Sequence, residues 1–350
     1  MASVDVRSWE RTLPRIAGRD VGFSIRRRAS SIARELLVRA NQSRVRGPKV
    51  VVKDDTDKTT VDDYWNDHTV NSKAFLSAKE SEKYLQWRSS EYPLFTEFMD
   101  LDRDHFGETV LDYGCGPGDD VIGFLLYSNA QKVIGIDVSD KALGLLRHRL
   151  ALHRVDPRRV ELLRITDATG KVPLPDASID WVHCSGVLHH ASHPQEITRE
   201  FRRVMKSGAQ GRLMLYNRDS IWYHVWIAYA QSILNDAFPG LTVDQAFTKS
   251  TDGPNCPVSE AWSSERVLEM ITAAGMDGAF RGGYFNAKEI EWLENYGKGA
   301  LAEKRLADEH RQFVAELKFD QRGYPMYRGK YSGIGGVYAI SKRSGAPTLR

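Results

Sequence analysis

The sequence predicts an α/β fold in which a parallel sheet carries helices on both faces. Three observations favour it: strand and helix patterns alternate, a glycine-rich turn follows the first strand, and an acid follows the second. The patterns alternate, strand first, through residues 108–113, 118–128, 131–138, 139–153, 158–167, 178–186, 193–206 and 211–217. Such alternation is typical of βαβ units, whose crossover helices cover the faces of a parallel sheet.

The glycine-rich turn lies in the stretch ETVLDYGCGPGDD. A short apolar strand ends there at Asp112 and opens into Gly114, Gly116 and Gly118 before a helical run. Glycines at this junction let the backbone turn sharply and let a ligand lie against bare main chain. The next strand, in KVIGIDV, ends at Asp137, 19 residues past Gly118. A carboxylate there is where an α/β fold holds the two hydroxyls of a ribose.

End signals mark two of the predicted helices. Ser139 and Asp140 suit the start of the helix over 139–153. Pro194 suits the first position of the helix over 193–206, and Gly208 suits the left-handed residue that ends it.

Length and composition indicate a globular protein of ordinary kind. The chain has 350 residues, 41% of them hydrophobic and 27% charged, which is enough for one large domain or two. It shows neither an apolar run long enough to span a bilayer nor a secretory leader. The three cysteines, Cys115, Cys184 and Cys256, lie far apart and lack the spacing of metal ligands. We therefore expect a cytoplasmic protein without disulfides and without a metal.

The first part of the chain is strongly basic. Residues 1–50 hold 12 Lys and Arg against 4 Asp and Glu. Within residues 20–46 the apolar side chains fall at helical spacing, which predicts a basic amphipathic helix. Such a helix could bind an anionic membrane or a second copy of the chain. The plain alternative is a solvated tail.

Aromatic-rich segments interrupt the alternating core and suggest a division of the chain. They either pack on the sheet or cover a substrate site at the carboxyl ends of the strands. The expected parts are a basic extension and linker (1–63), an N-terminal helical cap (64–106), a Rossmann-like core (107–218), a cap insertion (219–262), a core helix and strand (263–286), a second cap insertion (287–334), and a final strand and tail (335–350).

An acid followed by GxGxG resembles motif I of the class I S-adenosylmethionine-dependent methyltransferases. The later motifs follow in the order of the UbiE-like, type 11 branch of that family, through about residues 108–217 and more weakly to 343. The resemblance implies a Rossmann-like sheet of seven strands with the last one antiparallel. It also implies a transferase that uses S-adenosyl-L-methionine.

The resemblance implies roles for particular residues of a cofactor site. Glycines at the motif I positions pass under the methionine part of the cofactor, with Asp112 just before them. Asp137 holds the ribose hydroxyls, and the pair Asp167 and Ala168 meets the edge of the adenine. Ser185, at the end of the fourth strand, faces the methionine end. The motif I glycines are Gly114, Gly116 and Gly118.

Residues ahead of the first strand extend this expected site. Arg88 could pair with the cofactor carboxylate as a charge-assisted fork, the alternative being a surface arginine. The aromatic faces of Tyr64, Trp65 and Tyr84 could favour the positive sulfonium.

Histidines are the candidate catalytic residues. His189 and His190, in GVLHH, follow the fourth strand on the rim toward which the methyl group would point. Some sugar O-methyltransferases of the branch use the same LHH pair as a base, and imidazole has a suitable pKa for this work. A structural hydrogen bond at the strand end is the alternative. His224, on an aromatic helix, is a further candidate, with packing as its alternative.

These residues predict methyl transfer to a small molecule, by preference to a hydroxyl on a sugar-like or secondary-metabolite scaffold. Carbon and nitrogen acceptors, including lipids, stay open. A nicotinamide-dependent dehydrogenase and a non-catalytic membrane- or RNA-binding module are the rivals from other classes. The chain lacks the Asn/Asp-Pro-Pro-aromatic run of amino-directed nucleic-acid methyltransferases, and also the carboxylate cluster of magnesium-dependent enzymes. We therefore do not expect a nucleic-acid partner.

Overall fold

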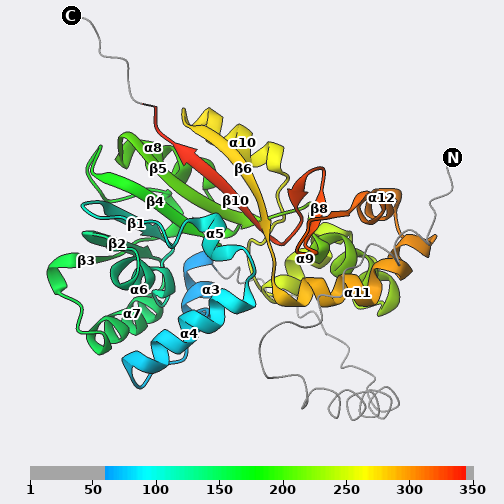
Figure 1. Ribbon diagram of the computed structural model, residues 1–350, viewed down its shortest axis with the longest axis horizontal. Coiled ribbons are helices and arrows are strands. Elements are labelled where there is room, and N and C mark those ends of the chain that lie inside the picture. Colours follow the sequence, from blue (N-terminus) through cyan, green and yellow to red (C-terminus); the bar gives the residue numbers. More distant parts are fainter. Residues whose placement is uncertain (1–59, 344–350) are drawn as a thin grey trace, which may run out of the picture. The chain divides into compact units, whose positions relative to one another are not determined.

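The computed structural model describes residues 60–343 (Figure 1). The predicted basic helix within 20–46, with its proposed membrane or self-association role, lies outside the described residues. The described residues, apart from 319–323, belong to one compact unit. In the described part of the chain, no helix is both long and apolar enough to cross a membrane.

A seven-stranded sheet forms the centre of this unit. Its order is β3-β2-β1-β4-β5-β10-β6, and only β10 runs antiparallel to its neighbours. This confirms the predicted fold, the antiparallel last strand included. The strands are β1 (Thr109–Tyr113), β2 (Lys132–Asp137), β3 (Val160–Arg164), β4 (Ile179–Ser185), β5 (Met205–Tyr216), β6 (Asp277–Tyr284) and β10 (Gly335–Ser341). The strand order reverses between β1 and β4, and open α/β sheets bind ligands at such a point.

Helices cover both faces of the sheet (Figure 1). On one face lie α6 (Asp119–Leu126) and α7 (Asp140–Leu152), and on the other lie α8 (Pro194–Val204) and α10 (Ser264–Ala273). Successive residues of a strand point to opposite faces. Val110 of β1 accordingly packs with the α6 and α7 side chains, and its neighbour Leu111 packs with those of α8 and α10. Burial on both faces explains why the strands read as short apolar runs.

The predicted break between the helix over 193–206 and the strand over 211–217 is wrong. The helix α8 ends at Val204, and β5 begins at once with Met205 instead of at residue 211. Gly208 has a positive φ of 78°, but it lies inside β5, where its N–H donates to the carbonyl of Lys342. The left-handed residue was predicted correctly, and the element that contains it was not.

The remaining elements come from the aromatic-rich segments and from short turns. A long π-helix, η4, contacts α9, α11 and α12, and these four lie together in Figure 1. Strands β8 and β9 pair antiparallel. The helical elements are α3 (Val61–Asp67), α4 (Ala78–Glu91), α5 (Phe95–Met99), η1 (Pro157–Arg159), η2 (Asp167–Thr169), η3 (Leu188–His190), η4 (Trp222–Leu234), α9 (Val243–Thr251), α11 (Ala287–Ala302) and α12 (Asp308–Glu316), and the short strands are β7 (Lys318–Phe319), β8 (Pro325–Tyr327) and β9 (Lys330–Tyr331).

Candidate active site

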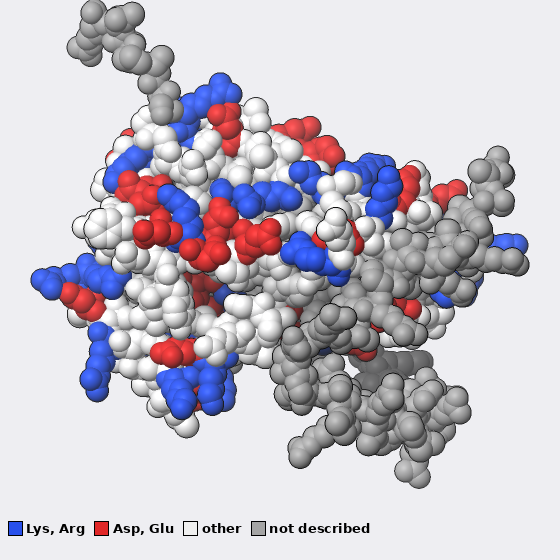
Figure 2. Space-filling view, viewed as in Figure 1, with Lys and Arg blue, Asp and Glu red and all other residues white. Residues whose placement is uncertain are grey.

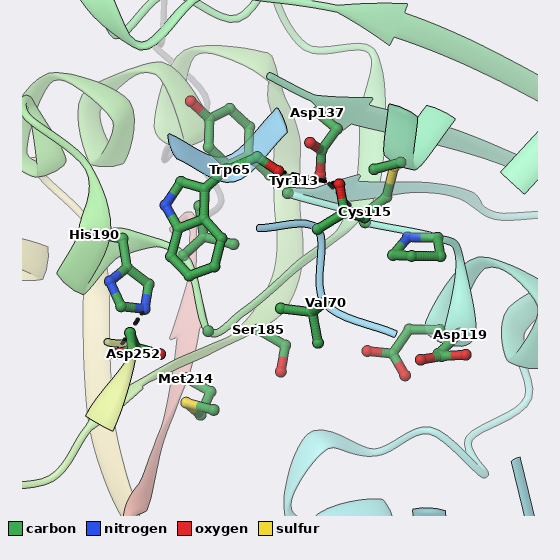
Figure 3. Close-up of a pocket in the computed structure, with 18 of the residues that line it drawn as sticks. Trp65, Val70, Tyr113, Cys115, Asp119, Asp137, Ser185, His190, Met214 and Asp252 are labelled. Atoms are coloured by element: carbon green, nitrogen blue, oxygen red, sulfur yellow. Dashed lines mark hydrogen bonds and ion pairs between the residues drawn. The ribbon is translucent and has the colours of Figure 1, made fainter. Parts of the chain in front are cut away.

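A cavity of about 380 Å³ lies at the carboxyl ends of β1, β2 and β4 (Figure 3). Its volume falls within the range of small-molecule sites. The core contributes the glycine turn after β1 and the acid that ends β2. Each of the aromatic-rich segments 64–106, 219–262 and 287–334 also contributes lining residues, among them Trp65, Trp222 and Ile334.

The three glycines of the turn have different surroundings. All have positive φ, between 52° and 84°. A Cβ on Gly114 would lie 2.1 Å from Val187, and one on Gly118 would lie 2.1 Å from Leu146 of α7. A Cβ on Gly116 would meet no atom within 4 Å. Gly114 and Gly116 line the cavity, whereas Gly118 is not among its lining residues. Bare main chain therefore faces the cavity at Gly116, and Gly118 serves the packing of α6 on α7.

Asp137 fixes the other side of the turn. Its carboxylate accepts hydrogen bonds from the backbone N–H of Gly116 at 2.7 Å and from that of Ser139 at 2.8 Å. The side chain is buried and lines the cavity (Figure 3). Burial raises the pKa of Asp137, while the backbone donors oppose that rise. The carboxylate oxygens retain lone pairs that could accept from a ribose hydroxyl pair.

A buried charge network lies under the glycine turn. Asp112 is buried, one of its carboxylate oxygens has no partner among the described residues, and burial raises its pKa to about 7. Arg88 of α4 binds Asp120 of α6 through both terminal nitrogens, and His183 of β4 lies 2.9 Å from the same carboxylate. Although burial raises the pKa of Asp120, the charges of Arg88 and His183 lower it overall.

Arg88 is not an exposed surface residue, which was the alternative to a role in the cofactor site. Only 19% of its side chain is exposed, it lines the cavity, and it stacks over Phe95. Its pairing with a cofactor carboxylate stays a prediction. In this structure its guanidinium is held by Asp120.

The predicted adenine-side residues are separated by the structure. Asp167 lines the cavity, and its carboxylate accepts from the backbone N–H of Ser192 at 3.1 Å. Ala168 is exposed and is absent from the lining residues, because the turn η2 directs it outward. Ser185 lies at the end of β4 and lines the cavity, as Figure 3 shows.

His190 lies in the wall of the cavity. It is buried, lines the cavity, and its Nδ1 lies 2.7 Å from the carbonyl oxygen of Val258. A carbonyl only accepts, so Nδ1 carries the proton and Nε2 is left with a free lone pair. Burial lowers the pKa of His190, which favours the neutral ring. Nε2 lies 3.8 Å from a carboxylate oxygen of Asp252 (Figure 3).

The other two candidate histidines lie outside the cavity. His189 is buried against the ring of Tyr216, with centroids 3.8 Å apart, and its Nδ1 accepts from the backbone N–H of Tyr216. His224 lies on η4, stacked on Phe313 with its Nδ1 2.8 Å from Nδ1 of His310. Neither is a lining residue. Both are packed side chains, which favours the structural alternatives, and the catalytic roles of His189 and His224 stay predictions.

Aromatic side chains form much of the rest of the wall. Of the three upstream candidates, Trp65 and Tyr84 line the cavity. Tyr64 does not, because it stacks on His68 and donates its hydroxyl to the carbonyl of Asp252. The lining residues that sequence reasoning missed include Tyr92, Phe95, Tyr216, Trp222, Asp252, Tyr284 and Asn286.

Asp252 is the most consequential of the missed residues. It follows α9 in the stretch KSTDGPN, whose only sequence signal is that of a turn. Its carboxylate accepts from the hydroxyls of Tyr216 at 3.0 Å and Ser259 at 2.7 Å. The contact with His190 joins positions 62 residues apart in the chain, and no local pattern encodes it.

Residues 104–275 match the family model described as "Methyltransferase domain". This stretch runs from the approach to β1 through α10 and contains the glycine turn, Asp137 and His190. It is a class I S-adenosylmethionine-dependent methyltransferase domain. S-adenosylmethionine is its methyl donor, as the motif order predicted, and the nicotinamide alternative is wrong.

Several curated proteins are similar to parts of the chain. An "Uncharacterized 37.1 kDa protein in transposon TN4556" of Streptomyces fradiae is 36% identical over 145 residues, or 41% of this chain and 36% of that protein. A "Ubiquinone biosynthesis O-methyltransferase" of Pseudomonas paraeruginosa is 27% identical over 185 residues, or 53% and 74%. A "27-O-demethylrifamycin SV methyltransferase" of Amycolatopsis mediterranei is 36% identical over 109 residues, or 31% and 38%. The chain thus spans about a third of the first and third relatives and about three quarters of the second.

The side chains present suit this methyl donor. Gly116 leaves space for a ligand against the main chain, and Asp137 offers acceptors for a ribose. The unpartnered oxygen of Asp112 gives the buried end of the turn a free acceptor for a donor group. In the domain, the glycine turn and the acid after β2 are the residues that would hold the nucleoside.

Proposed function

We propose that this protein transfers a methyl group from S-adenosylmethionine to a hydroxyl of a small molecule, with His190 as the general base. The observation that carries the proposal is the contact of His190 Nδ1 with the Val258 carbonyl oxygen at 2.7 Å, which leaves Nε2 of the neutral ring free to accept a proton in the cavity wall. Two of the relatives with O-methylation in their names support an oxygen acceptor. A sugar-like or secondary-metabolite scaffold is the acceptor class that we favour.

The bound cofactor supplies an electrophilic methyl group on a sulfonium. The chain's own part is to align an acceptor hydroxyl and to take its proton. Alignment can provide a large share of the barrier reduction in such a displacement. The carbonyl of Val258 fixes the imidazole ring and its tautomer, so that Nε2 receives the proton as the hydroxyl oxygen forms its new bond.

Asp252 supports the same step. When His190 becomes an imidazolium, the carboxylate 3.8 Å from Nε2 stabilises the new positive charge. The hydroxyls of Tyr216 and Ser259 hold that carboxylate in place. We further propose that the segments 64–106, 219–262 and 287–334 form a helical cap over the acceptor, since each contributes lining residues.

The test replaces His190 by alanine. We expect turnover to fall by about 10² to 10⁴, the usual contribution of a general base. We expect the affinity for S-adenosylhomocysteine to stay within about twofold, a difference below 1 kcal/mol. His193→Ala is the matched control, since His193 is exposed and makes no side-chain cap contact with α8. Unchanged turnover in His190→Ala would remove this residue from the mechanism.

The pH dependence of kcat/KM tests the same assignment. Only neutral His190 can accept a proton, and burial lowers its pKa from the ordinary value of 6.5. Activity should therefore be full above pH 6.5 and fall only in more acidic solution. The acid limb should vanish in His190→Ala and persist in His193→Ala. An acid limb common to all three proteins would assign the titration to another group.

A further inference from the structure

We infer that the methyl acceptor carries no anionic group and is a neutral or cationic compound with at least one flat apolar ring. This inference rests on the proposed function, because it concerns the acceptor half of the same cavity. The charges and rings that the cavity presents beside His190 carry it.

The charged side chains of the cavity are nearly all acidic. Among the described residues that line it, there are six aspartates, one arginine and no lysine. The arginine is Arg88, whose guanidinium already binds the Asp120 carboxylate through both terminal nitrogens. The aspartates are Asp112, Asp119, Asp120, Asp137, Asp167 and Asp252. Within residues 60–343, the lining thus has no uncommitted cation to offer to a carboxylate, phosphate or sulfate of an acceptor.

The acidic residue beside the base is the one that an acceptor would meet. Asp252 lies 3.8 Å from Nε2 of His190, and its other partners are the neutral hydroxyls of Tyr216 and Ser259. No lysine or arginine of residues 60–343 forms an ion pair with it. Its side chain is only 13% exposed, so water screens its charge weakly. A second negative charge at this end of the cavity would be repelled and would lack a partner.

Rings make up the surface against which the acceptor would pack. The ring centroids of Trp65 and His190 lie 4.8 Å apart, and those of Tyr216 and His190 lie 5.5 Å apart in an edge-to-face arrangement. Phe95 and Tyr284 form a second edge-to-face pair at 4.9 Å. Aromatic walls favour flat apolar partners, and their faces attract cations. The surface of the molecule is different: on the face shown in Figure 2, acidic and basic side chains are interspersed.

The first experiment lets the source cells supply the acceptor. A protein-free extract is incubated with the enzyme and with S-adenosylmethionine labelled on its methyl group, and the products are sorted on an anion exchanger. We expect the labelled product in the neutral or cationic fraction. Retention of the label as an anion would overturn the inference and leave hydroxyl transfer intact. If no product is labelled although the protein binds S-adenosylhomocysteine, the proposed function falls, and the inference falls with it.

The second experiment measures the charge discrimination with a matched pair. p-Nitrophenyl β-glucoside and p-nitrophenyl β-glucuronide share the nitrophenyl ring and the sugar ring. They differ at one carbon, which is a hydroxymethyl group in the first and a carboxylate in the second. Each compound is added as a competitor of the labelled methyl transfer to the extract. We expect the glucoside to compete at about tenfold lower concentration. In Asp252→Asn the two should compete nearly equally, while Asp236→Asn, an exposed residue after η4, should keep the difference. Equal competition in the wild type, or none by either compound, contradicts the inference.

Discussion

Gly116 and Gly118 lie in one turn, yet different neighbours require each of them. Both have a positive φ, of 52° and 84°. The missing side chain of Gly116 leaves open space, whereas that of Gly118 leaves room for Leu146, a fully buried residue of α7. We therefore propose that the first glycine serves ligand binding, whereas the second serves core packing. Substitution by alanine should separate the two effects.

For Gly116→Ala we expect the Kd of S-adenosylhomocysteine to rise about tenfold or more, because the methyl group occupies the ligand's space. The left-handed backbone should cost about 1–2 kcal/mol of unfolding free energy. For Gly118→Ala, overpacking against Leu146 should add about 1–3 kcal/mol to that cost, while the Kd changes little. Calorimetric titration and urea unfolding measure both quantities. Equal loss of affinity in the two variants would contradict this division of roles.

The meeting of the glycine turn and Asp137 at the cavity could be predicted, because they follow one another in a short stretch of sequence. The glycine turn and Asp137 sit at the ends of consecutive strands, and strand ends of a parallel sheet meet at one edge. The choice between His189 and His190 could not be made in this way. The two are adjacent in the turn η3, but Tyr216 encloses one ring and Val258 directs the other into the cavity. Those partners come from distant segments.

At the scale of elements, one buried carboxylate joins three pieces of the cavity wall. Glu289 of α11 accepts from the backbone N–H of Trp222 at 3.0 Å, of Asn286 at 2.9 Å and of Ile334 at 3.1 Å. The three donors belong to the start of η4, the cap of α11 and the approach to β10. Their residues all line the cavity. Glu289 is fully buried and is not itself a lining residue, so it acts as a positioning residue.

Glu289→Gln should loosen this wall. The amide nitrogen cannot accept, so at least one buried N–H loses its partner at a cost of about 1–3 kcal/mol of unfolding free energy. We expect the KM for the acceptor to rise, with the affinity for S-adenosylhomocysteine unchanged, because none of the three donors belongs to the glycine turn or to β2. Glu291→Gln, exposed on the same helix, is the control. Loss of cofactor affinity in Glu289→Gln would show that the residue supports the whole fold instead.

Most core elements were predictable from the sequence to within two residues. The exceptions are the strand expected over 158–167, which is β3 at Val160–Arg164, and the strand expected over 211–217, which is β5 at Met205–Tyr216. The strand expected over 131–138 is β2 at Lys132–Asp137, and the helix expected over 139–153 is α7 at Asp140–Leu152. Periodicity and capping encode these elements locally. The boundary at Gly208 failed because the pairing of β5 with β4 and β10 extends the strand back to Met205. Strand pairing with distant segments thus sets the start of β5, and a local signal such as Gly208 cannot reveal it.

At the scale of the whole molecule, buried histidines link stability to pH. Burial lowers the pKa of His189 and of His224 well below the ordinary 6.5. The folded state therefore holds fewer protons than the unfolded state once the pH falls below 6.5. The stability that these groups contribute is fully present above that value and is lost in more acidic solution.

We expect the unfolding free energy to fall by about 1.4 kcal/mol per pH unit below pH 6.5 for each such histidine. Urea unfolding at a series of pH values measures this slope. His224→Gln should reduce this slope by about 1.4 kcal/mol per pH unit, because it removes one buried group that takes up a proton only in the unfolded state. His193→Gln, an exposed histidine, should leave the slope unchanged. Identical slopes in all three proteins would place the titration elsewhere.

We propose that the cavity, with its glycine turn and its buried His190, transfers a methyl group to oxygen. The most direct test uses S-adenosylmethionine carrying a ¹³C-labelled methyl group, with the product examined by NMR. We predict a new O-methyl signal from the wild-type protein and its near loss in His190→Ala. A labelled methyl on nitrogen or carbon, or an O-methyl signal undiminished in His190→Ala, would contradict the account.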